Sequence, residues 1–420
     1  MNQIFTLYPG ITLRCFPSDR FKQSCLTVQF VRPMRREEAA MNALLPAVLL
    51  RGCRKYTDLR DITLRLDDLY GASVGALVRR VGDYQTTGFY CGFIEDRFTM
   101  DGDAVLSPMI ELAGQLLLEP VLQDGGFLPG YVESEKKNLI STIESQLNDK
   151  RAYAMEQMVR RMCAGDSFGI PRLGEKEQVA VIDPKGLYEH YCKVLRESPV
   201  EICYVGSAQP ETVADLLRGL FDFPRAPITL PSQTAFSGGP GGDFTEQMEV
   251  NQGKLCMGFV TPIHIRSREF VAMQLLNTVF GGGMTSKLFM HIRETLSLCY
   301  AIGSGYHGSK GILTVSAGID SNLSDTVKKE ILGQLEACRA GEISEQELEA
   351  ARQALRSSLL ATYDSPGAIE NYFASAALSG LTLTPEEYLR EVEQTGVEQL
   401  VAAARKLQLH TTFFLQGVTP

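Results

Sequence analysis

The apolar positions of the first half of the chain predict helices and strands in alternation. Residues 5–31 alternate in pieces and end in a strand, and further strands are expected at 73–80, 84–94 and 200–206. Apolar residues recurring every three or four positions predict helices at 39–50, 59–69, 104–118, 132–162 and 184–194. Gly82 and Asp83 are typical of a hairpin turn. Pro46 lies inside the first of these helices and is expected to kink or weaken it.

The element order appears a second time after a segment rich in proline and glycine. Residues 223–243 read as an interdomain linker. Beyond it, a helix at 266–280, a strand at 312–319, a helix at 344–362 and a strand at 411–417 follow the order of the first half. We therefore predict two α/β or α+β domains built by duplication, at 1–222 and 244–420. Two unrelated domains are the alternative.

One stretch of the second half, residues 281–300, combines a glycine-rich turn with candidate chemistry. Gly281, Gly282 and Gly283 are expected to permit positive φ and the close approach of another chain. Ser286 fits the N-cap of a short helix that ends at about Glu294, and a strand is expected to run through residue 300. The three glycines are therefore candidate substrate-binding residues.

Arg293 and Tyr300 are the candidate catalytic side chains of this stretch. A guanidinium at a helix end and a phenol on the adjoining strand can converge on one anionic oxygen or peptide carbonyl. The alternative is structural, because Arg at a helix C-terminus complements the helix dipole and Tyr is common in strands.

Composition and charge narrow the classes of function. The 420 residues include 44% hydrophobic and 22% charged residues, and the net charge of −9 argues against nucleic acid or an anionic membrane as partner. The ten cysteines form no C-x-x-C pair and several lie in apolar runs, as expected of buried, reduced thiols. We found no signal peptide or membrane-spanning stretch and expect a cytoplasmic protein.

The stretch at 281–300 resembles the C-terminal signature of the pitrilysin/insulinase family of zinc peptidases. The family has a glycine-containing turn, S-x-L-F, an arginine, and a tyrosine seven residues later, which match here as Arg293 and Tyr300. The resemblance implies an α+β fold of two similar domains. Each would hold a mixed, largely antiparallel sheet covered by helices on one face, and together they would enclose a chamber. In the family, the Arg/Tyr pair helps to hold the substrate carbonyl opposite the zinc.

The metal-binding half of the family site is missing from the sequence. The inverted H-x-x-E-H motif falls on Ala43, Pro46 and Ala47, and the later metal-binding glutamate falls on Thr142. None of these side chains can bind zinc. Pro46 further suggests that the helix geometry is not retained. Glu135 matches a family glutamate and is expected to be a solvated helix residue.

This asymmetry predicts a non-catalytic subunit of a heterodimeric insulinase-family metallopeptidase. The chain would bind no cofactor and be inactive alone. A homologous zinc-bearing subunit would be its partner, and short peptides would be the substrate of the resulting zinc metalloendopeptidase complex. An extended peptide would add to a sheet edge. A structural or peptide-binding homodimer without peptidase activity is the alternative, and a hydrolase with an unrecognised site is a third.

Overall fold

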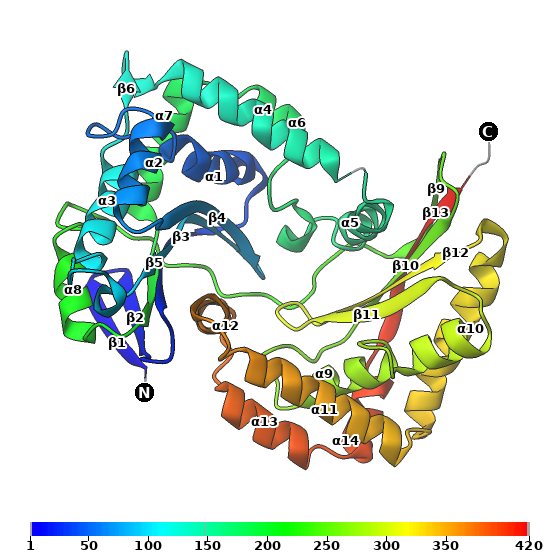
Figure 1. Cartoon of the computed structure of the whole chain (residues 1–420). Coiled ribbons are helices and arrows are strands. Elements are labelled where there is room, and N and C mark those ends of the chain that lie inside the picture. The colour runs from blue at the N-terminus through cyan, green and yellow to red at the C-terminus, as the bar shows by residue number, and fades with distance from the viewer. Residues whose placement is uncertain (1, 147, 418–420) are drawn as a thin grey trace. The chain divides into compact units, whose positions relative to one another are not determined.

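The protein forms two compact units, each built around its own sheet. The computed structural model describes residues 2–146 and 148–417 (Figure 1). The first unit comprises Met1–Glu144, Ile170–Ser232 and Tyr363–Leu378, and the second comprises Ser145–Gly169, Gln233–Thr362 and Ser379–Pro420. The predicted α+β class with two sheet-containing halves is confirmed.

The sheet of the first unit has the strand order β1-β2-β8-β3-β5-β4. Its strands are β1 (Gln3–Tyr8), β2 (Ile11–Pro17), β3 (Gln23–Pro33), β4 (Ser73–Val81), β5 (Tyr84–Ile94) and β8 (Val200–Gly206). β2 and β8 are parallel, whereas the other neighbours are antiparallel. Gly82, with φ of 59°, makes the predicted hairpin turn between β4 and β5. A short ribbon, β6 (Leu122–Gln123) with β7 (Gly126–Phe127), lies outside this sheet.

Helices of the first half pack their apolar faces on one side of that sheet. Leu26, Val28 and Phe30 of β3 face this core together with Leu44 and Ile110 of two of the helices. The elements are α1 (Arg36–Leu49), α2 (Leu59–Asp68), η1 (Asp96–Phe98), α3 (Leu106–Leu118), α4 (Pro129–Ser145), α6 (Lys176–Ala180), α7 (Pro184–Glu197) and α8 (Pro210–Arg218).

The sheet of the second unit repeats the topology of the first. Its order is β11-β12-β10-β13-β9, which corresponds element by element to β4-β5-β3-β8-β2. The strands are β9 (Gly242–Met248), β10 (Gly253–Val260), β11 (Ala301–His307), β12 (Ile312–Ile319) and β13 (Gln408–Gly417). The pair β13 and β9 is parallel, as is its counterpart, and the other neighbours are antiparallel. The shared order, including the position of the parallel pair, supports duplication.

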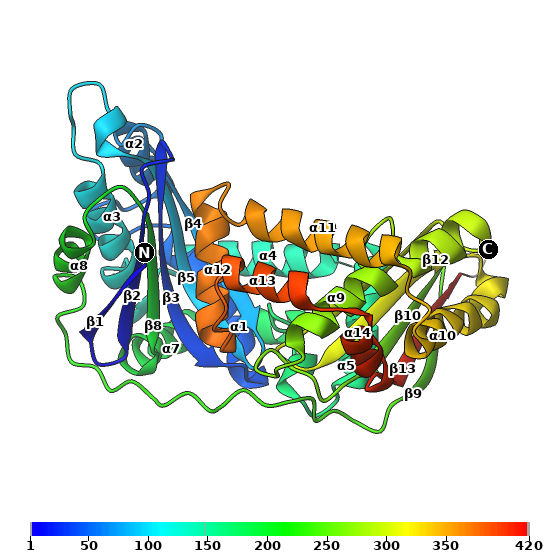
Figure 2. The ribbon, with the colours of Figure 1, turned by 90° about the horizontal axis from the view of Figure 1, so that it is seen from below.

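Helices of the second half pack around this sheet, and they follow its strands along the chain as the helices of the first half follow theirs. They are α9 (Phe270–Phe280), η3 (Leu288–Thr295), η4 (Ser321–Leu323), α10 (Ser324–Ala340), α11 (Glu345–Ala361), α13 (Pro385–Gln394) and α14 (Val397–Arg405). Figures 1 and 2 show α9, α10 and α14 beside the strands β10 to β13.

Each unit also receives one helix from the other half of the chain. α5 (Lys150–Met162), followed by η2 (Ser167–Gly169), belongs to the second unit, and α12 (Pro366–Ser379) belongs to the first. Ala154 and Met158 of α5 pack on Cys256 and Phe413 of the second sheet. Ile369 of α12 packs on Val205 of the first. The two segments 145–169 and 363–378 thus depart from the domain boundaries predicted by chain order.

One helix prediction needs correction. The single helix expected at 132–162 is two helices, α4 and α5, because the Asp149 carboxylate caps a new helix by accepting from the N–H groups of Arg151 and Ala152. α1 continues through Pro46 to Leu49, and the expected kink or weakening at the proline stays a prediction.

The segment between α8 and β9 contains neither helix nor strand, as expected of a linker. It is held by specific contacts. The Tyr84 hydroxyl donates to the Pro231 carbonyl at 2.5 Å, and the Phe236 N–H donates to the Lys310 carbonyl at 3.1 Å.

Candidate functional site

Arg293 lies on the π-helix η3, which is wider than an α-helix because its hydrogen bonds join residues five apart. The Leu296 N–H donates to the His291 carbonyl at 2.9 Å, and the Thr295 hydroxyl donates to the Met290 carbonyl at 2.9 Å. The N-cap of this helix is Lys287 and not the predicted Ser286, although the Ser286 hydroxyl, one residue earlier, accepts from the Phe289 N–H at 3.4 Å. π-helical turns occur frequently at functional sites.

The Arg293 guanidinium remains accessible. Its side chain is 41% exposed, its Cζ lies 4.5 Å from the centre of the Phe289 ring, and its Nε lies 3.6 Å from Glu294 Oε1. Burial raises the pKa of the Cys299 thiol to about 11, and the positive charge of Arg293 opposes this rise. The charge of Arg293 therefore influences Cys299, the residue that immediately precedes Tyr300.

Tyr300 immediately precedes β11 and is 60% exposed. Its N–H donates to the Gly318 carbonyl at 3.0 Å, which ties the backbone to the neighbouring strand while the phenol stays accessible. Ser297, between η3 and Tyr300, has a left-handed φ of 52°, uncommon for a non-glycine residue. The local backbone thus presents Arg293 and Tyr300 on consecutive, firmly placed elements.

The three glycines line a hollow of about 640 Å³ in the second unit. None of them has positive φ, contrary to prediction. Gly281 and Gly282 are instead required by close packing. A Cβ on Gly281 would meet Ser304 Oγ at 2.6 Å, and one on Gly282 would meet Thr278 Cα at 2.8 Å. A Cβ on Gly283 would meet nothing within 4 Å.

The floor of the hollow consists of small residues on one face of the second sheet. Gly303 and Gly305 of β11 pair with Ser316 and Thr314 of β12, and since side chains alternate along strands these four positions share a face. β11 is an edge strand. Walls are formed by α5 and by the turn before η3, and the lining includes Asp149, Arg151, Ala152, Met155, Met284, Phe289 and Ile302. Sequence reasoning missed the contribution of α5, because that helix comes from the first half of the chain.

The positions of the lost zinc motif lie on an intact helix. Ala43 and Pro46 are buried in α1 and Ala47 is half-buried beside them, whereas Thr142 is exposed on α4 and donates to the Asn138 carbonyl. The Thr87 hydroxyl donates at 2.7 Å to the Asn42 carbonyl, the oxygen that Pro46 leaves without a helical N–H. This bond explains why the helix persists through a proline.

Glu135 is not the solvated residue that was expected. Its side chain is 13% exposed and its Oε1 lies 3.4 Å from Nη1 of Arg51, whose guanidinium also lies over the Tyr131 ring. A cation from the protein itself therefore neutralises the one family carboxylate that remains.

The donor set does not fit a zinc ion. Methyl groups, a proline ring and a threonine occupy the metal positions. Within residues 2–146 and 148–417, no three His, Cys, Asp or Glu side chains form a group that could hold a metal. His190 is the one histidine near α1, and its Nε2 is bonded to Asn42 Oδ1 at 2.7 Å.

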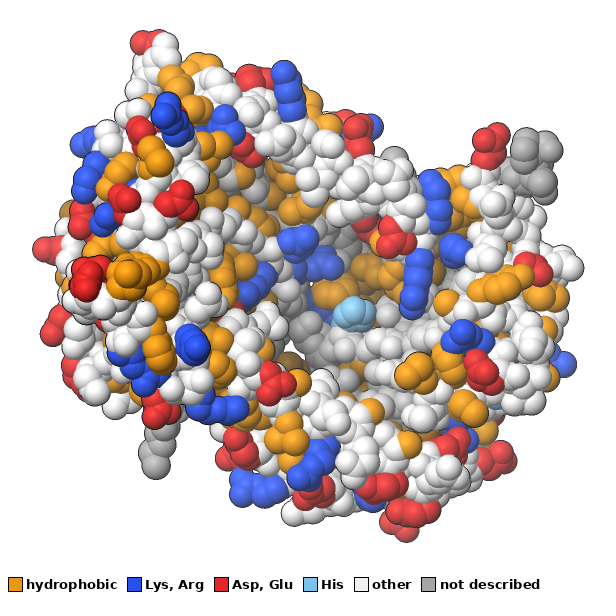
Figure 3. Space-filling view, in the orientation of Figure 1, with side chains coloured by type: hydrophobic (Ala, Val, Ile, Leu, Met, Phe, Trp, Pro, Cys, Tyr) orange, Lys and Arg blue, Asp and Glu red, His pale blue; other side chains and the backbone are white. Residues whose placement is uncertain are grey.

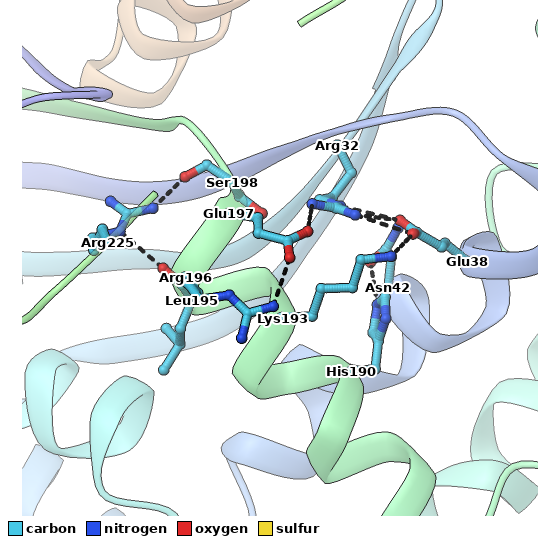
Figure 4. Close-up of polar contacts among 10 residues, drawn as sticks. All are labelled: Arg32, Glu38, Asn42, His190, Lys193, Leu195, Arg196, Glu197, Ser198 and Arg225. Carbon is cyan, nitrogen blue, oxygen red and sulfur yellow. Dashed lines mark hydrogen bonds and ion pairs between the residues drawn. The ribbon is translucent and has the colours of Figure 1, made fainter. Parts of the chain in front are cut away.

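A charged, largely buried network lies beside His190, which is joined to it through Asn42 (Figure 4). Arg32 binds both oxygens of Glu38 at 2.9 to 3.0 Å, and Lys193 Nζ binds Glu38 Oε1 at 2.6 Å. Burial would raise the pKa of Glu38, but the hydrogen bond from Lys193 and the charge of Arg32 lower it below the ordinary value. Burial lowers the pKa of His190 to about 4. The network joins α1, β3 and α7 around the helix that lost its metal ligands.

All ten cysteines are free, and all except Cys192 are buried, as predicted. Burial raises the pKa of Cys91 and Cys256 to about 12, which keeps these thiols protonated and unreactive. Each helix that the structure describes is too short or too polar to cross a lipid bilayer. Figure 3 shows acidic and basic side chains interspersed over the visible face. The candidate site is therefore identified from the contacts of particular residues and not from surface charge.

Comparison with known proteins identifies the class. A family profile described as the peptidase M16 inactive domain matches residues 182–355. A Bacillus subtilis protein named "Probable inactive metalloprotease YmfF" is 27% identical over 418 residues, which cover 99% of this chain and 98% of the relative. Residues 182–355 therefore match a domain of the M16, insulinase-like peptidase family, and nearly the whole chain is similar to a probable inactive metalloprotease, in line with the resemblance at 281–300.

Solved structures share this fold. A conserved protein from Enterococcus faecalis V583 matches with a TM-score of 0.92 and 26% identity, covering 100% of this chain and 99% of the other. A peptidase M16 inactive domain from Pseudomonas fluorescens matches with a TM-score of 0.82 and 17% identity, covering 100% and 98%, which supports the fold.

Proposed function

We propose that this chain is the non-catalytic subunit of a two-subunit M16-type peptidase that cleaves short peptides. The observation that carries the proposal is an asymmetry between the two units. Arg293 and Tyr300 are exposed beside η3 in the second unit, whereas the metal positions of the first hold Ala43, Pro46, Ala47 and Thr142.

In the proposed complex, Arg293 and Tyr300 bind the carbonyl oxygen of the peptide bond that is cut. The guanidinium and the phenol are both hydrogen-bond donors, and such donors stabilise the negative charge that develops on this oxygen. A homologous subunit with an intact H-x-x-E-H motif would hold the zinc, and that ion would supply the activation of the attacking water. The Arg293 guanidinium lies over the Phe289 ring and near Glu294, and both contacts favour the orientation that it has in this structure.

The substrate peptide extends along the edge strand β11 in this proposal. Strand addition satisfies the free backbone groups of an edge. The Gly281 carbonyl already accepts from the Ser304 N–H at 2.8 Å, so the turn covers one point of the edge and limits the length available to a peptide. Gly281, Gly282 and Gly283 then act as substrate-binding residues because they line the adjoining hollow.

The experiment is reconstitution. The purified chain and an M16 subunit with intact zinc ligands from the same genome are assayed separately and mixed, with zinc measured in each. We expect zinc in the partner, a stable complex by size-exclusion chromatography, and peptide cleavage by the mixture at a rate well above either chain alone. A homodimer that neither binds the partner nor raises its activity would overturn the proposal and favour a peptide-binding scaffold.

A further inference from the structure

Arg151, at the start of α5, projects a guanidinium into the hollow beside η3. Its Nε donates to the Ser316 hydroxyl at 3.0 Å, and its Nη2 lies 3.9 Å from where a Cβ on Gly303 would be. Its two terminal nitrogens have no hydrogen-bond partner among the residues that the structure describes. The guanidinium is thus oriented by Ser316 while its planar end remains available.

The neighbouring charged groups leave a positive excess over this floor. Lys254 of β10 lies on the same face of the sheet, and Arg151 repels it, adding to the effect of burial in lowering the pKa of Lys254. Asp149 also lines the hollow, but its Oδ1 accepts from the Arg151 and Ala152 N–H groups as the cap of α5. The floor of the hollow therefore carries a net positive charge, which favours the binding of an anion to Arg151.

The shape of the hollow indicates what kind of anion fits. Gly303, Gly305, Thr314 and Ser316 leave room above the sheet, and Met155, Met284, Phe289 and Ile302 add apolar surface. An arginine whose end is free binds a carboxylate through two parallel hydrogen bonds. A peptide offers both an apolar side chain and a carboxylate, whereas an inorganic anion offers only charge.

We propose that Arg151 is a substrate-positioning residue that binds a carboxylate of a peptide held in this hollow. The inference extends the proposed function by giving the substrate class as peptides with either an acidic side chain or a free C-terminal carboxylate. It also explains why the second unit contains a helix from the first half of the chain, since α5 delivers the only cation among the lining residues.

The test measures peptide binding to the full chain without a partner. Three fluorescent peptides of equal length share one apolar sequence: one has a single Glu and an amidated C-terminus, one has no Glu and a free C-terminus, and one has neither carboxylate. We expect the wild-type chain to bind at least one of the first two about tenfold or more tightly than the third, as for a hydrogen-bonded charge pair. The peptide that gains identifies the source of the carboxylate.

Variants assign the effect to Arg151. Arg151→Ala should abolish the preference, Arg151→Lys should retain part of it, and Arg160→Ala should leave it intact because Arg160 lies on the same helix and pairs with Glu156. Circular dichroism of each variant verifies folding. Equal affinity of the wild-type chain for all three peptides, no binding of any of them, or an unchanged preference in Arg151→Ala would overturn the inference.

This result is separable from the proposed function. A reconstituted peptidase that cleaves carboxylate-bearing and neutral peptides equally well would refute the role of Arg151 alone. Peptide binding that depends on Arg151, in a chain that never raises the activity of a partner, would refute the catalytic partnership alone.

Discussion

Arg79 and Glu370 form two parallel 2.8 Å hydrogen bonds inside the first unit, although 291 residues separate them in the chain. The Glu370 carboxylate is fully buried and also accepts from the Thr27 hydroxyl and the Gln29 amide, each at 3.0 Å. A single side chain of α12 thus fixes a helix of the second half to the first sheet.

Removing this buried charge should destabilise the protein. Glu370→Gln leaves Arg79 without its counter-ion, and since Arg79 is 22% exposed we expect the free energy of unfolding to fall by about 2–3 kcal/mol. Urea denaturation followed by circular dichroism measures the change. Glu393→Gln is the matched control, because Glu393 pairs with Arg356 at the surface, and it should cost less than about 1 kcal/mol. Equal costs for the two variants would refute the proposed role of Glu370.

The persistence of α1 through Pro46 predicts a coupling with Thr87. Thr87→Val should cost about 1–3 kcal/mol, because the buried Asn42 carbonyl then loses the donor that replaces the missing Pro46 N–H. Pro46→Ala restores a helical N–H for that carbonyl and should reduce the cost of Thr87→Val in the double variant. A double-mutant cycle by urea denaturation measures this interaction. Strictly additive effects would mean that Thr87 does not compensate for the proline.

The low pKa of His190 in the folded protein predicts that the protein loses stability on mild acidification. Its pKa is about 4 in the folded protein and about 6.5 in the unfolded chain, so only the unfolded chain gains a proton between these values. The contribution is fully present above pH 6.5 and is lost as the pH falls toward 4, amounting to roughly 3 kcal/mol. Urea midpoints at pH 7.5, 6 and 5 should decline more steeply for wild type than for His190→Gln. Parallel declines would contradict the buried, neutral state of His190.

Two glycines of the turn before η3, Gly281 and Gly283, provide a test variant and its matched control. Gly281→Ala should displace the turn, because its Cβ would meet Ser304 Oγ at 2.6 Å, and should reduce peptide binding in the hollow at least several-fold. Gly283→Ala should be neutral, since its Cβ meets nothing within 4 Å. Binding of a fluorescent peptide to both variants tests this difference. A loss of similar size in both would show that flexibility, and not packing, is what the turn requires.

Local patterns predicted the elements well because they depend on neighbours in sequence. The alternation of apolar and polar residues predicted β5 at Tyr84–Ile94, and the capping signal of Asp183 followed by Pro184 predicted the start of α7. The division into α4 and α5 was missed although Asp149 carries the capping signal, because apolar spacing continues on both sides of it.

The site was less predictable because it depends on long-range packing. The exchange of α5 and α12 between the two units has no local signature, so the contribution of Arg151 to the hollow was not foreseen. The burial of Glu135 depends on Arg51, 84 residues away. Arg293 and Tyr300 became candidates only through the family signature, since residue type and spacing also fit structural roles, and their role stays a prediction.

The catalytic partnership is tested most directly by the kcat/KM of peptide cleavage in the reconstituted mixture. With an excess of variant chain over the zinc-bearing subunit, Arg293→Ala should lower kcat/KM by about 10²-fold or more and Tyr300→Phe by about 10-fold or more, with complex formation unchanged. Arg356→Ala, a change at the exposed pair with Glu393, should leave the rate as in wild type. Rates unchanged by both Arg293→Ala and Tyr300→Phe would contradict the account and leave these two residues with structural roles.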